Sequence, residues 1–194
     1  LACCPEGHYI CDVCLNCDAY EILKVICEST VETDPMLILE KVFTHPSVPV
    51  HGPEHHAIVP AVIVAAVRNS GYEVPLNAVE IAIKRGREVP GASCGTHGAC
   101  GAAVGVGVAV SILTDADPIK GKERGLANRA AGKALINTGD GFPRCCKRVS
   151  RKSIETAVIF LMDEMFILLD TAPLGRCKYP ALNKECAFKE CKYF

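Results

Sequence analysis

The residues best suited to chemistry lie in two short turns that each lead into a helix-like segment. In the first, Val89–Val110, a glycine-rich turn carries Cys94, His97 and Cys100 and continues into small apolar residues. Unpaired backbone N–H groups and the helix dipole would favour a thiolate on Cys100, whereas desolvation would keep the thiol neutral. No Gly-Lys-Ser/Thr follows the turn, so a phosphate-binding P-loop is excluded.

The second turn, Pro143–Arg148, is organised in the same way. Pro143 suits the first position of a helix, and two adjacent thiols follow it at once. The cations that flank these thiols are Arg144, Lys147 and Arg148. We therefore expect the thiols of both turns to converge on one site, formed by Cys94, Cys100, Cys145 and Cys146.

A histidine-rich segment, His51-Gly-Pro-Glu54-His55-His56, lies at a predicted helix start and could move protons at that site. It lacks the zinc-protease pattern, in which Glu directly follows the first His. Its side chains are either capping and buried hydrogen-bonding groups or general acids and bases beside the thiols. In the second case the catalytic residues are Cys94, Cys100, His51, Glu54, His55 and His56. The cations expected to bind an anionic substrate are Arg85, Arg144, Lys147 and Arg148.

Cysteines near the N-terminus have a spacing typical of metal sites. Cys11 and Cys14 form a Cys-x2-Cys knuckle, for which Cys4 or His8 could supply a third ligand. Cys3 or Cys4, together with Cys17, could complete the ligand set. Zinc is the simplest metal for this knuckle, although the spacing also suits an iron–sulfur cluster. A second paired-cysteine turn does not precede the knuckle in this sequence, so a truncated site is an alternative.

The C-terminal segment carries Cys177-x8-Cys186-x4-Cys191 and has no periodic pattern. It has too little apolar mass to order itself, which indicates a metal clip. Three tail thiolates with Cys145 or Cys146 would suit a four-iron cluster, and three alone would suit a catalytic cluster with one open iron. Structural zinc is the alternative.

The composition limits the class of protein. The chain has 194 residues, and 49% of them are hydrophobic. Its net charge of −1 produces no overall electrostatic attraction to nucleic acid or to an anionic membrane. Thirteen cysteines, without an apolar leader in the first 20 residues, favour reduced thiols in a cytoplasm over a secreted disulfide framework. The longest apolar runs are too short to span a bilayer.

Apolar residues three and four apart predict helices through most of the chain. Helices are expected at residues 19–29, from 35 to before Pro46, from Pro53 through 57–67, from 75 to Gly86, at 102–113, at 121–137, and from Pro143 through Leu168. The uncharged segment Ala102–Leu113 should be the central helix, and Asn128 should be a satisfied polar core group or a substrate contact. We predict an all-α bundle with three parts: a cysteine-rich knuckle (1–18), a helical domain (19–172) and a cysteine-rich clip (173–194).

Several motifs together resemble a microbial family that is catalogued only as a domain of unknown function. They are His51–His56, Val89–Gly91, Cys94–Gly105, Leu126–Asn128, Pro143–Arg148 and the C-terminal Cys-x8-Cys-x4-Cys. The resemblance covers nearly the whole chain and implies a helical, cytoplasmic protein of anaerobes, without naming a reaction. Members often carry a further Cys-x2-Cys before the first cysteines, which this sequence lacks.

The leading hypothesis is an iron–sulfur enzyme of anaerobic metabolism that acts on a small anionic or sulfur-containing substrate. Lyase or sulfur-transfer chemistry fits, because a cluster iron can act as a Lewis acid while a thiolate attacks. The candidate metal ligands are Cys4, Cys11, Cys14, Cys17, Cys145, Cys146, Cys177, Cys186 and Cys191. The alternatives are a zinc-stabilised scaffold that binds a protein partner, and an iron–sulfur carrier or electron-transfer protein.

Overall fold

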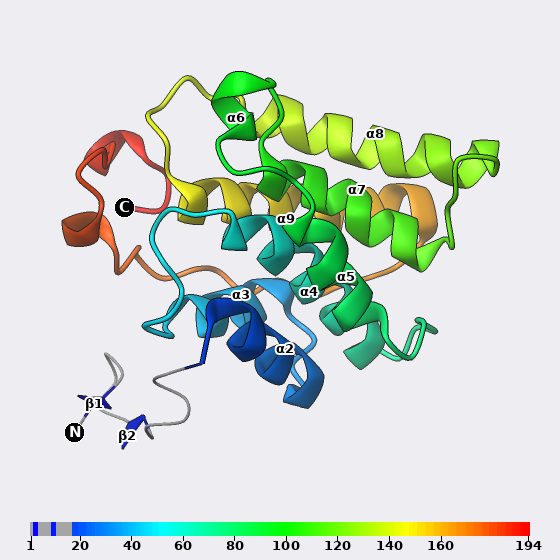
Figure 1. Cartoon of the computed structure of the whole chain (residues 1–194), viewed down its shortest axis with the longest axis horizontal. Helices are drawn as coiled ribbons and strands as arrows, with labels where there is room; N and C mark the ends of the chain where they lie inside the picture. The colour runs from blue at the N-terminus through cyan, green and yellow to red at the C-terminus, as the bar shows by residue number, and fades with distance from the viewer. Residues whose placement is uncertain (1, 4–8, 11–16) are drawn as a thin grey trace.

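The structure, a computed structural model, describes residues 2–3, 9–10 and 17–194, and the regular secondary structure of this part of the chain is mostly helical (Figure 1). The helices are α2 (Ala19–Ser29), α3 (Pro35–Phe43), α4 (Glu54–Asn69), α5 (Ala78–Arg87), α6 (Ser93–Thr96), α7 (Gly101–Leu113), α8 (Gly121–Thr138) and α9 (Cys146–Met165). Two 3₁₀ turns, η1 (Pro180–Leu182) and η2 (Phe188–Glu190), follow them. The short strands β1 (Ala2–Cys3) and β2 (Tyr9–Ile10) pair antiparallel near the N-terminus. The all-α prediction is confirmed.

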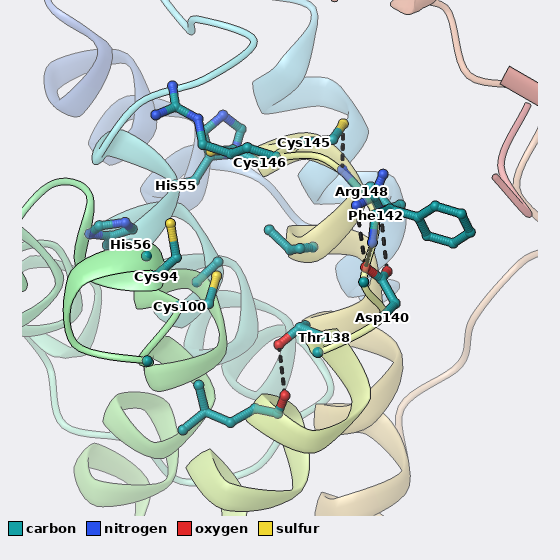
Figure 2. A pocket seen from close by; sticks show the side chains of 18 residues that line it. His55, His56, Cys94, Cys100, Thr138, Asp140, Phe142, Cys145, Cys146 and Arg148 are labelled. Carbon is teal, nitrogen blue, oxygen red and sulfur yellow. Dashed lines mark hydrogen bonds and ion pairs between the residues drawn. The ribbon is translucent and has the colours of Figure 1, made fainter. Parts of the chain in front are cut away.

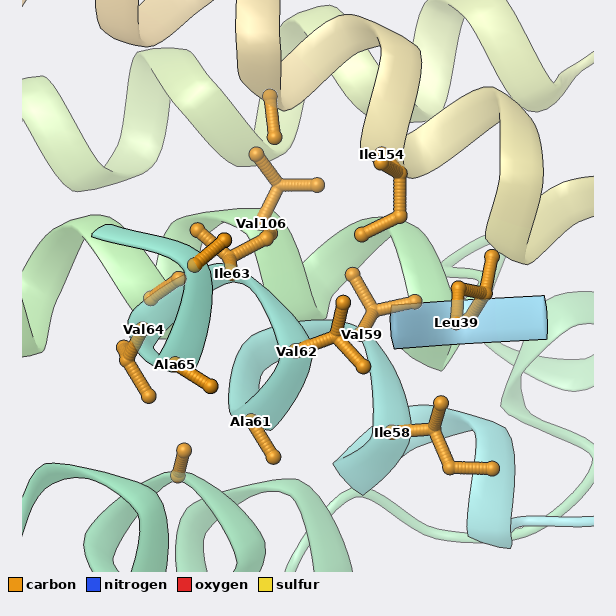
Figure 3. Packing of buried hydrophobic residues seen from close by; sticks show 14 of the residues in the cluster. Leu39, Ile58, Val59, Ala61, Val62, Ile63, Val64, Ala65, Val106 and Ile154 are labelled. Atoms are coloured by element: carbon orange, nitrogen blue, oxygen red, sulfur yellow. The ribbon is translucent and has the colours of Figure 1, made fainter. Parts of the chain in front are cut away.

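The core is built around α4, whose residues 55–67 are all buried (Figure 3). This helix packs against α2, α3, α5, α7 and α9, while α7 packs against α4, α5, α8 and α9. Pro60 lies inside α4 without ending it. The prediction that the helix at Ala102–Leu113 is the central one is not confirmed, since α4 is buried along most of its length.

Small residues on α7 let its neighbours approach closely. A Cβ atom at Gly105 would lie 2.7 Å from Cδ of Pro60 on α4, and one at Gly107 would lie 2.7 Å from the carbonyl oxygen of Ala127 on α8. Both contacts are shorter than real Cβ atoms make, so only glycine fits. The glycines in this segment therefore serve helix packing.

Three helix boundaries differ from the prediction. The helix expected from residue 75 begins at Ala78, because Pro75 closes a turn in which its carbonyl accepts a hydrogen bond from Ala78 N–H (3.0 Å). Gly86 does not end this helix but lies within it, buried where a Cβ would come within 2.4 Å of Cα of Ala57. The last long helix begins at Cys146, three residues after Pro143, and Cys145 is its N-cap.

Two side-chain expectations were wrong. Asn128 lies exposed on α8, so it is not a satisfied polar group of the core. The buried face of that helix consists of Ala127, Ala130 and Ala134. Leu168 lies beyond the end of α9 and is exposed, because the helix stops at Met165.

The C-terminal segment returns to the end of the bundle at which α9 begins (Figure 1). It is fastened by Ala172 N–H, which donates to Asp34, and by Asn183, whose Oδ1 accepts from Nε2 of His51 (3.0 Å). The backbone N–H of Cys177 donates to the carbonyl of Tyr193 at 2.6 Å, which closes the segment on itself. Among the described helices none is long and apolar enough to cross a membrane. Cys4, Cys11 and Cys14 of the predicted knuckle lie outside the described residues.

Candidate functional site

The first candidate site, which we call the large cavity, has a volume of about 400 Å³ and lies among α6, the start of α7, the end of α8 and the start of α9 (Figure 2). Four thiols from the two predicted turns line it: Cys94, Cys100, Cys145 and Cys146. The structure thus brings together residues that lie some fifty positions apart in the sequence. A cavity of this size falls within the usual range for small-molecule sites.

Local structure explains how each thiol reaches the large cavity. Cys94 is exposed on the short helix α6, and Cys100 is the half-buried N-cap of α7. Cys145 and Cys146 are the N-cap and the first residue of α9. Backbone N–H groups lie close to three of the sulfurs, those of Cys100, Cys145 and Cys146.

Burial nevertheless decides the protonation of three of these thiols. Burial raises the pKa of Cys100, although the amides of Ala103 and Ala102 act in the opposite direction. It also raises the pKa of Cys145, against the lowering effect of Arg148, and that of Cys146, against the amide of Gly52. The thiolate expected on Cys100 from the helix start is therefore not favoured, and these thiols are neutral near pH 7 unless an acceptor or a metal takes the proton.

A second site, which we call the small cavity, lies on the other side of Cys145. Its volume is about 20 Å³, which is about enough for one water molecule. Its mostly apolar wall includes four thiols: Cys145, Cys177, Cys186 and Cys191. Cys145 and Arg148 line both cavities.

Hydrogen-bond donors point at three of the four sulfurs of the small cavity. The backbone N–H of Arg148 donates to Sγ of Cys145 (3.4 Å), and that of Phe188 donates to Sγ of Cys186 (3.4 Å). Nη1 of Arg151 donates to Sγ of Cys177 (3.5 Å). In the described part of the chain, no three His, Cys, Asp or Glu side chains stand close enough to hold a single metal ion.

Besides Arg148, two buried cations line the small cavity. The ammonium of Lys147 lies 4.2 Å from the ring centres of both Phe43 and Tyr179, and burial lowers its pKa to about 8. Arg151 forms an ion pair with Glu40 (2.6 Å), which raises the pKa of the guanidinium despite its burial. Positive charge is thus held next to the four thiols by aromatic rings and one carboxylate.

The four cations predicted to bind substrate are separated by the fold. Arg144 is exposed and lines the large cavity, whereas Lys147 lines only the small cavity. Arg148 is buried and pairs with Asp140, whose carboxyl pKa lies below its usual range because Lys152 and Arg148 outweigh the effect of burial. Arg85 lines neither cavity and donates to Ser111 (2.8 Å).

His55 lines the large cavity but is held by two hydrogen bonds. Nε2 lies 3.0 Å from the carbonyl oxygen of Pro49, which can only accept, so Nε2 carries the proton and Nδ1 accepts from Oγ of Ser150 (3.1 Å). Burial lowers the pKa of His55 to about 3. This environment favours the hydrogen-bonding interpretation over a general acid or base.

His56 has the geometry of a base at the large cavity. Its Nδ1 lies 3.1 Å from the carbonyl oxygen of Val89, so Nδ1 carries the proton and Nε2 is left as an acceptor. Among the described residues Nε2 has no hydrogen-bond partner. The other two residues of the motif face elsewhere: His51 contacts Asn183 of the C-terminal segment, and Glu54 lies near Tyr20, whose pKa is raised by burial and by this carboxylate.

Several contributors to the two cavities were missed in the sequence. Arg151 lies four residues after Lys147, so a helical spacing could have placed both on one face, but its partner Glu40 lies on α3 and left no local signal. Asp140 stands in a Gly-Asp-Gly turn whose carboxylate could have been expected to pair with nearby cations. Cys17, a predicted metal ligand, is half-buried near Ser47, whose hydroxyl donates to its carbonyl (2.8 Å).

The family of unknown function DUF5714 matches the chain over residues 23–194. No curated protein and no solved structure matches it. The matched range includes both cavities with all the residues that line them, and it begins after the N-terminal cysteines.

Proposed function

Since the chain belongs to the DUF5714 family, whose description names no reaction, we propose from the two cavities that it is an iron–sulfur enzyme. A four-iron cluster would be held at the small cavity by Cys145, Cys177, Cys186 and Cys191. A small anionic, sulfur-containing substrate would bind in the large cavity. The observation that carries the proposal is that Cys145 lines both cavities, so the proposed cluster would lie directly beside the proposed substrate site.

The donor set at the small cavity fits an iron–sulfur cluster. Four-iron clusters are held by four cysteine thiolates, and hydrogen bonds to the sulfurs tune their potential. Two backbone amides and one guanidinium already point at sulfurs here. Four thiolates also bring negative charge into an apolar wall, which Lys147 and Arg151 would offset.

Structural zinc and a four-iron cluster would need different spacings of these thiols. In a zinc site with Zn–S bonds of 2.3 Å, the ligand sulfurs stand roughly 3.8 Å apart. In a four-iron cluster each thiolate bonds a different iron, so the ring of sulfurs is wider. When bound, a cluster would supply either an electron or a Lewis-acidic iron to the adjacent substrate site.

Residues of the chain would bind and position the substrate in the large cavity. Arg144, exposed at this cavity, would hold an anionic group through its guanidinium fork. His56 would accept a proton at Nε2, and Cys94 offers the most exposed thiol. Sulfur transfer is the reaction class that these residues support best, because a thiol nucleophile, a base and an anion-binding cation share one cavity.

The N-terminal cysteines Cys4, Cys11, Cys14 and Cys17 remain candidates for a zinc knuckle. A cytoplasmic, anaerobic setting also remains a proposal, one that reduced thiols and an oxygen-sensitive cluster would require.

The test is metal and sulfide analysis of protein purified without oxygen, with electron paramagnetic resonance after reduction. The wild type should contain about four irons per chain at the small cavity. Cys186→Ser and Cys191→Ser should lose this iron, whereas the matched variant Cys94→Ser should keep it, since Cys94 lines only the large cavity. Only iron lost relative to the wild type is counted, so metal at the N-terminal cysteines does not interfere.

Zinc in place of iron at these four thiols would favour the zinc-stabilised scaffold. Unchanged iron in both Cys186→Ser and Cys191→Ser would contradict the proposed ligand set.

A further inference from the structure

The turn before α7 closes on itself in a way that pairs Cys94 with Cys100. The buried residue Ser93 makes two bonds to Ala99: Oγ donates to the Ala99 carbonyl (2.8 Å), and the Ser93 carbonyl accepts from Ala99 N–H (3.2 Å). Gly98 takes the positive φ of +64° that the closure requires. Because Ser93 and Ala99 are hydrogen-bonded to each other, the residues that follow them, Cys94 and Cys100, are brought close together.

Both thiols of this pair point into the large cavity. Figure 2 shows the sulfurs of Cys94 and Cys100 directed toward the same space. A charge on Cys94 also adds to the effect of burial in raising the pKa of Cys100, which is a sign of their proximity.

The two thiols differ in access. Cys94 is exposed on α6, where a ligand entering the cavity meets it first, whereas Cys100 is half-buried at the N-cap of α7. In thiol–disulfide exchange the accessible thiol attacks the substrate and a second thiol resolves the mixed disulfide. This asymmetry therefore assigns the attacking role to Cys94 and the resolving role to Cys100.

We propose that Cys94 and Cys100 form a redox-active dithiol that reduces small anionic disulfides or persulfides in the large cavity. The inference rests on the proposed function, which it deepens by naming the substrate class. It does not depend on how the small cavity binds metal, because neither thiol lines that cavity.

The reaction balances in two exchanges. The Cys94 thiolate attacks one sulfur of a disulfide R–S–S–R′, forming Cys94–S–S–R and releasing R′–S⁻. The Cys100 thiolate then attacks the Cys94 sulfur, forming the Cys94–Cys100 disulfide and releasing R–S⁻. The two protons of the cysteine thiols go to the two leaving thiolates, so the substrate gains two electrons and two protons. A dithiol reductant returns the pair to its starting state.

Other residues of the large cavity suit this chemistry. His56 lines it with an unprotonated Nε2, which can take the proton from Cys94 and pass it to the leaving thiolate. Arg144 would hold the anionic group of the substrate. Cys146 also lines the cavity, and it is the competing candidate for the resolving thiol.

The sequence makes the product easy to identify. Residues 88–120 form one tryptic fragment, because no Lys or Arg lies between Arg87 and Lys120, and it carries both Cys94 and Cys100. The experiment adds cystine to reduced, anaerobic, full-length protein, quenches with acid and alkylating agent, and analyses the fragments by mass spectrometry. The wild type should lose two hydrogens within this fragment.

Three variants separate the roles. Cys100→Ser should accumulate the mixed disulfide with half-cystine on Cys94, and Cys94→Ser should react at least ~10-fold more slowly. Cys146→Ser, the matched control, should still form the internal disulfide. A disulfide that includes Cys146, or a Cys100→Ser variant that traps no half-cystine, would overturn the proposal.

Iron measured in the same samples separates this inference from the proposed function. All three variants should retain the iron of the wild type. Failure of the dithiol reaction with iron retained overturns the dithiol alone, whereas an absence of iron with an intact dithiol reaction overturns the cluster alone.

Discussion

The substitution Gly101→Ala tests the contact that holds His56 in place at the large cavity. Gly101 is the first residue of α7 and follows Cys100 directly. A Cβ atom at this position would lie 2.3 Å from Cγ of His56 and 2.4 Å from Cδ2 and Nδ1. These are atoms of a rigid ring rather than the end of a flexible chain, so the ring or the helix must move.

The expected loss of stability in Gly101→Ala is the difference between the cost of overpacking and the gain in helix propensity. Ordinary contact begins at 3.4 Å, so the ring must shift by roughly 1 Å, and overpacking of this kind costs about 1–3 kcal/mol. The shift also strains the hydrogen bond from Nδ1 to Val89, worth about 1 kcal/mol. Alanine gains up to ~1 kcal/mol over glycine in a helix interior, and less at its first residue. The net expectation is a loss of about 1–3 kcal/mol.

Thermal unfolding followed by circular dichroism measures this loss. For a chain of this length it corresponds to a fall in Tm of roughly 2–12 °C. Gly132→Ala is the matched control, since Gly132 lies in the interior of α8 with nothing within 4 Å of its added Cβ. The control should raise Tm by about 1–4 °C. A Gly101→Ala protein as stable as the control would show that the His56 ring does not lie against Gly101.

Two further predictions concern buried titratable groups. His55→Gln should lower the free energy of unfolding by about 1–3 kcal/mol, because at least one of the hydrogen bonds to Ser150 and Pro49 is lost. The control His97→Gln, at an exposed position, should change this free energy by less than ~0.5 kcal/mol. Equal effects of the two substitutions in urea unfolding would contradict a structural role for His55. Burial lowers the pKa of Lys147 from 10.5 to about 8, so between these values the unfolded chain binds more protons and the Lys147 contribution to stability rises with pH. Lys147→Met should remove this rise, and identical pH dependence of the two proteins across that range would refute the assignment.

Local signals explain why some elements could be predicted from the sequence. The capping box of Asp18 and Glu21 starts α2, and Asp34 caps α3 with Pro35 at its first position. Each of these signals acts within one turn of helix, so neighbouring residues are sufficient to identify it. Tertiary contacts overrode the signal at Gly86, which resembles a helix stop but is required for close packing against α4.

The candidate site was predictable only in part, for a similar reason. Two thiols beside a helix start can be seen in the sequence, and their convergence in the large cavity was expected. The direction of their pKa shifts could not be predicted, because the helix dipole and burial act in opposite directions and burial depends on distant elements. The cations also could not be assigned, because successive helical residues point about 100° apart, so Lys147 and Arg148 contact different partners.

The raised thiol pKa values connect the two cavities in the proposed enzyme. Cys145 would bind the cluster as a thiolate, yet burial favours its neutral form, so metal binding must release its proton. The amide and the guanidinium of Arg148 both lower the pKa of Cys145, against the effect of burial. The guanidinium is held in place by Asp140, which lies in the wall of the large cavity. Substrate binding beside Asp140 would therefore change the pKa of the proposed cluster ligand Cys145 through Arg148. This arrangement gives a physical reason for the ion pair between Arg148 and Asp140 at the start of α9.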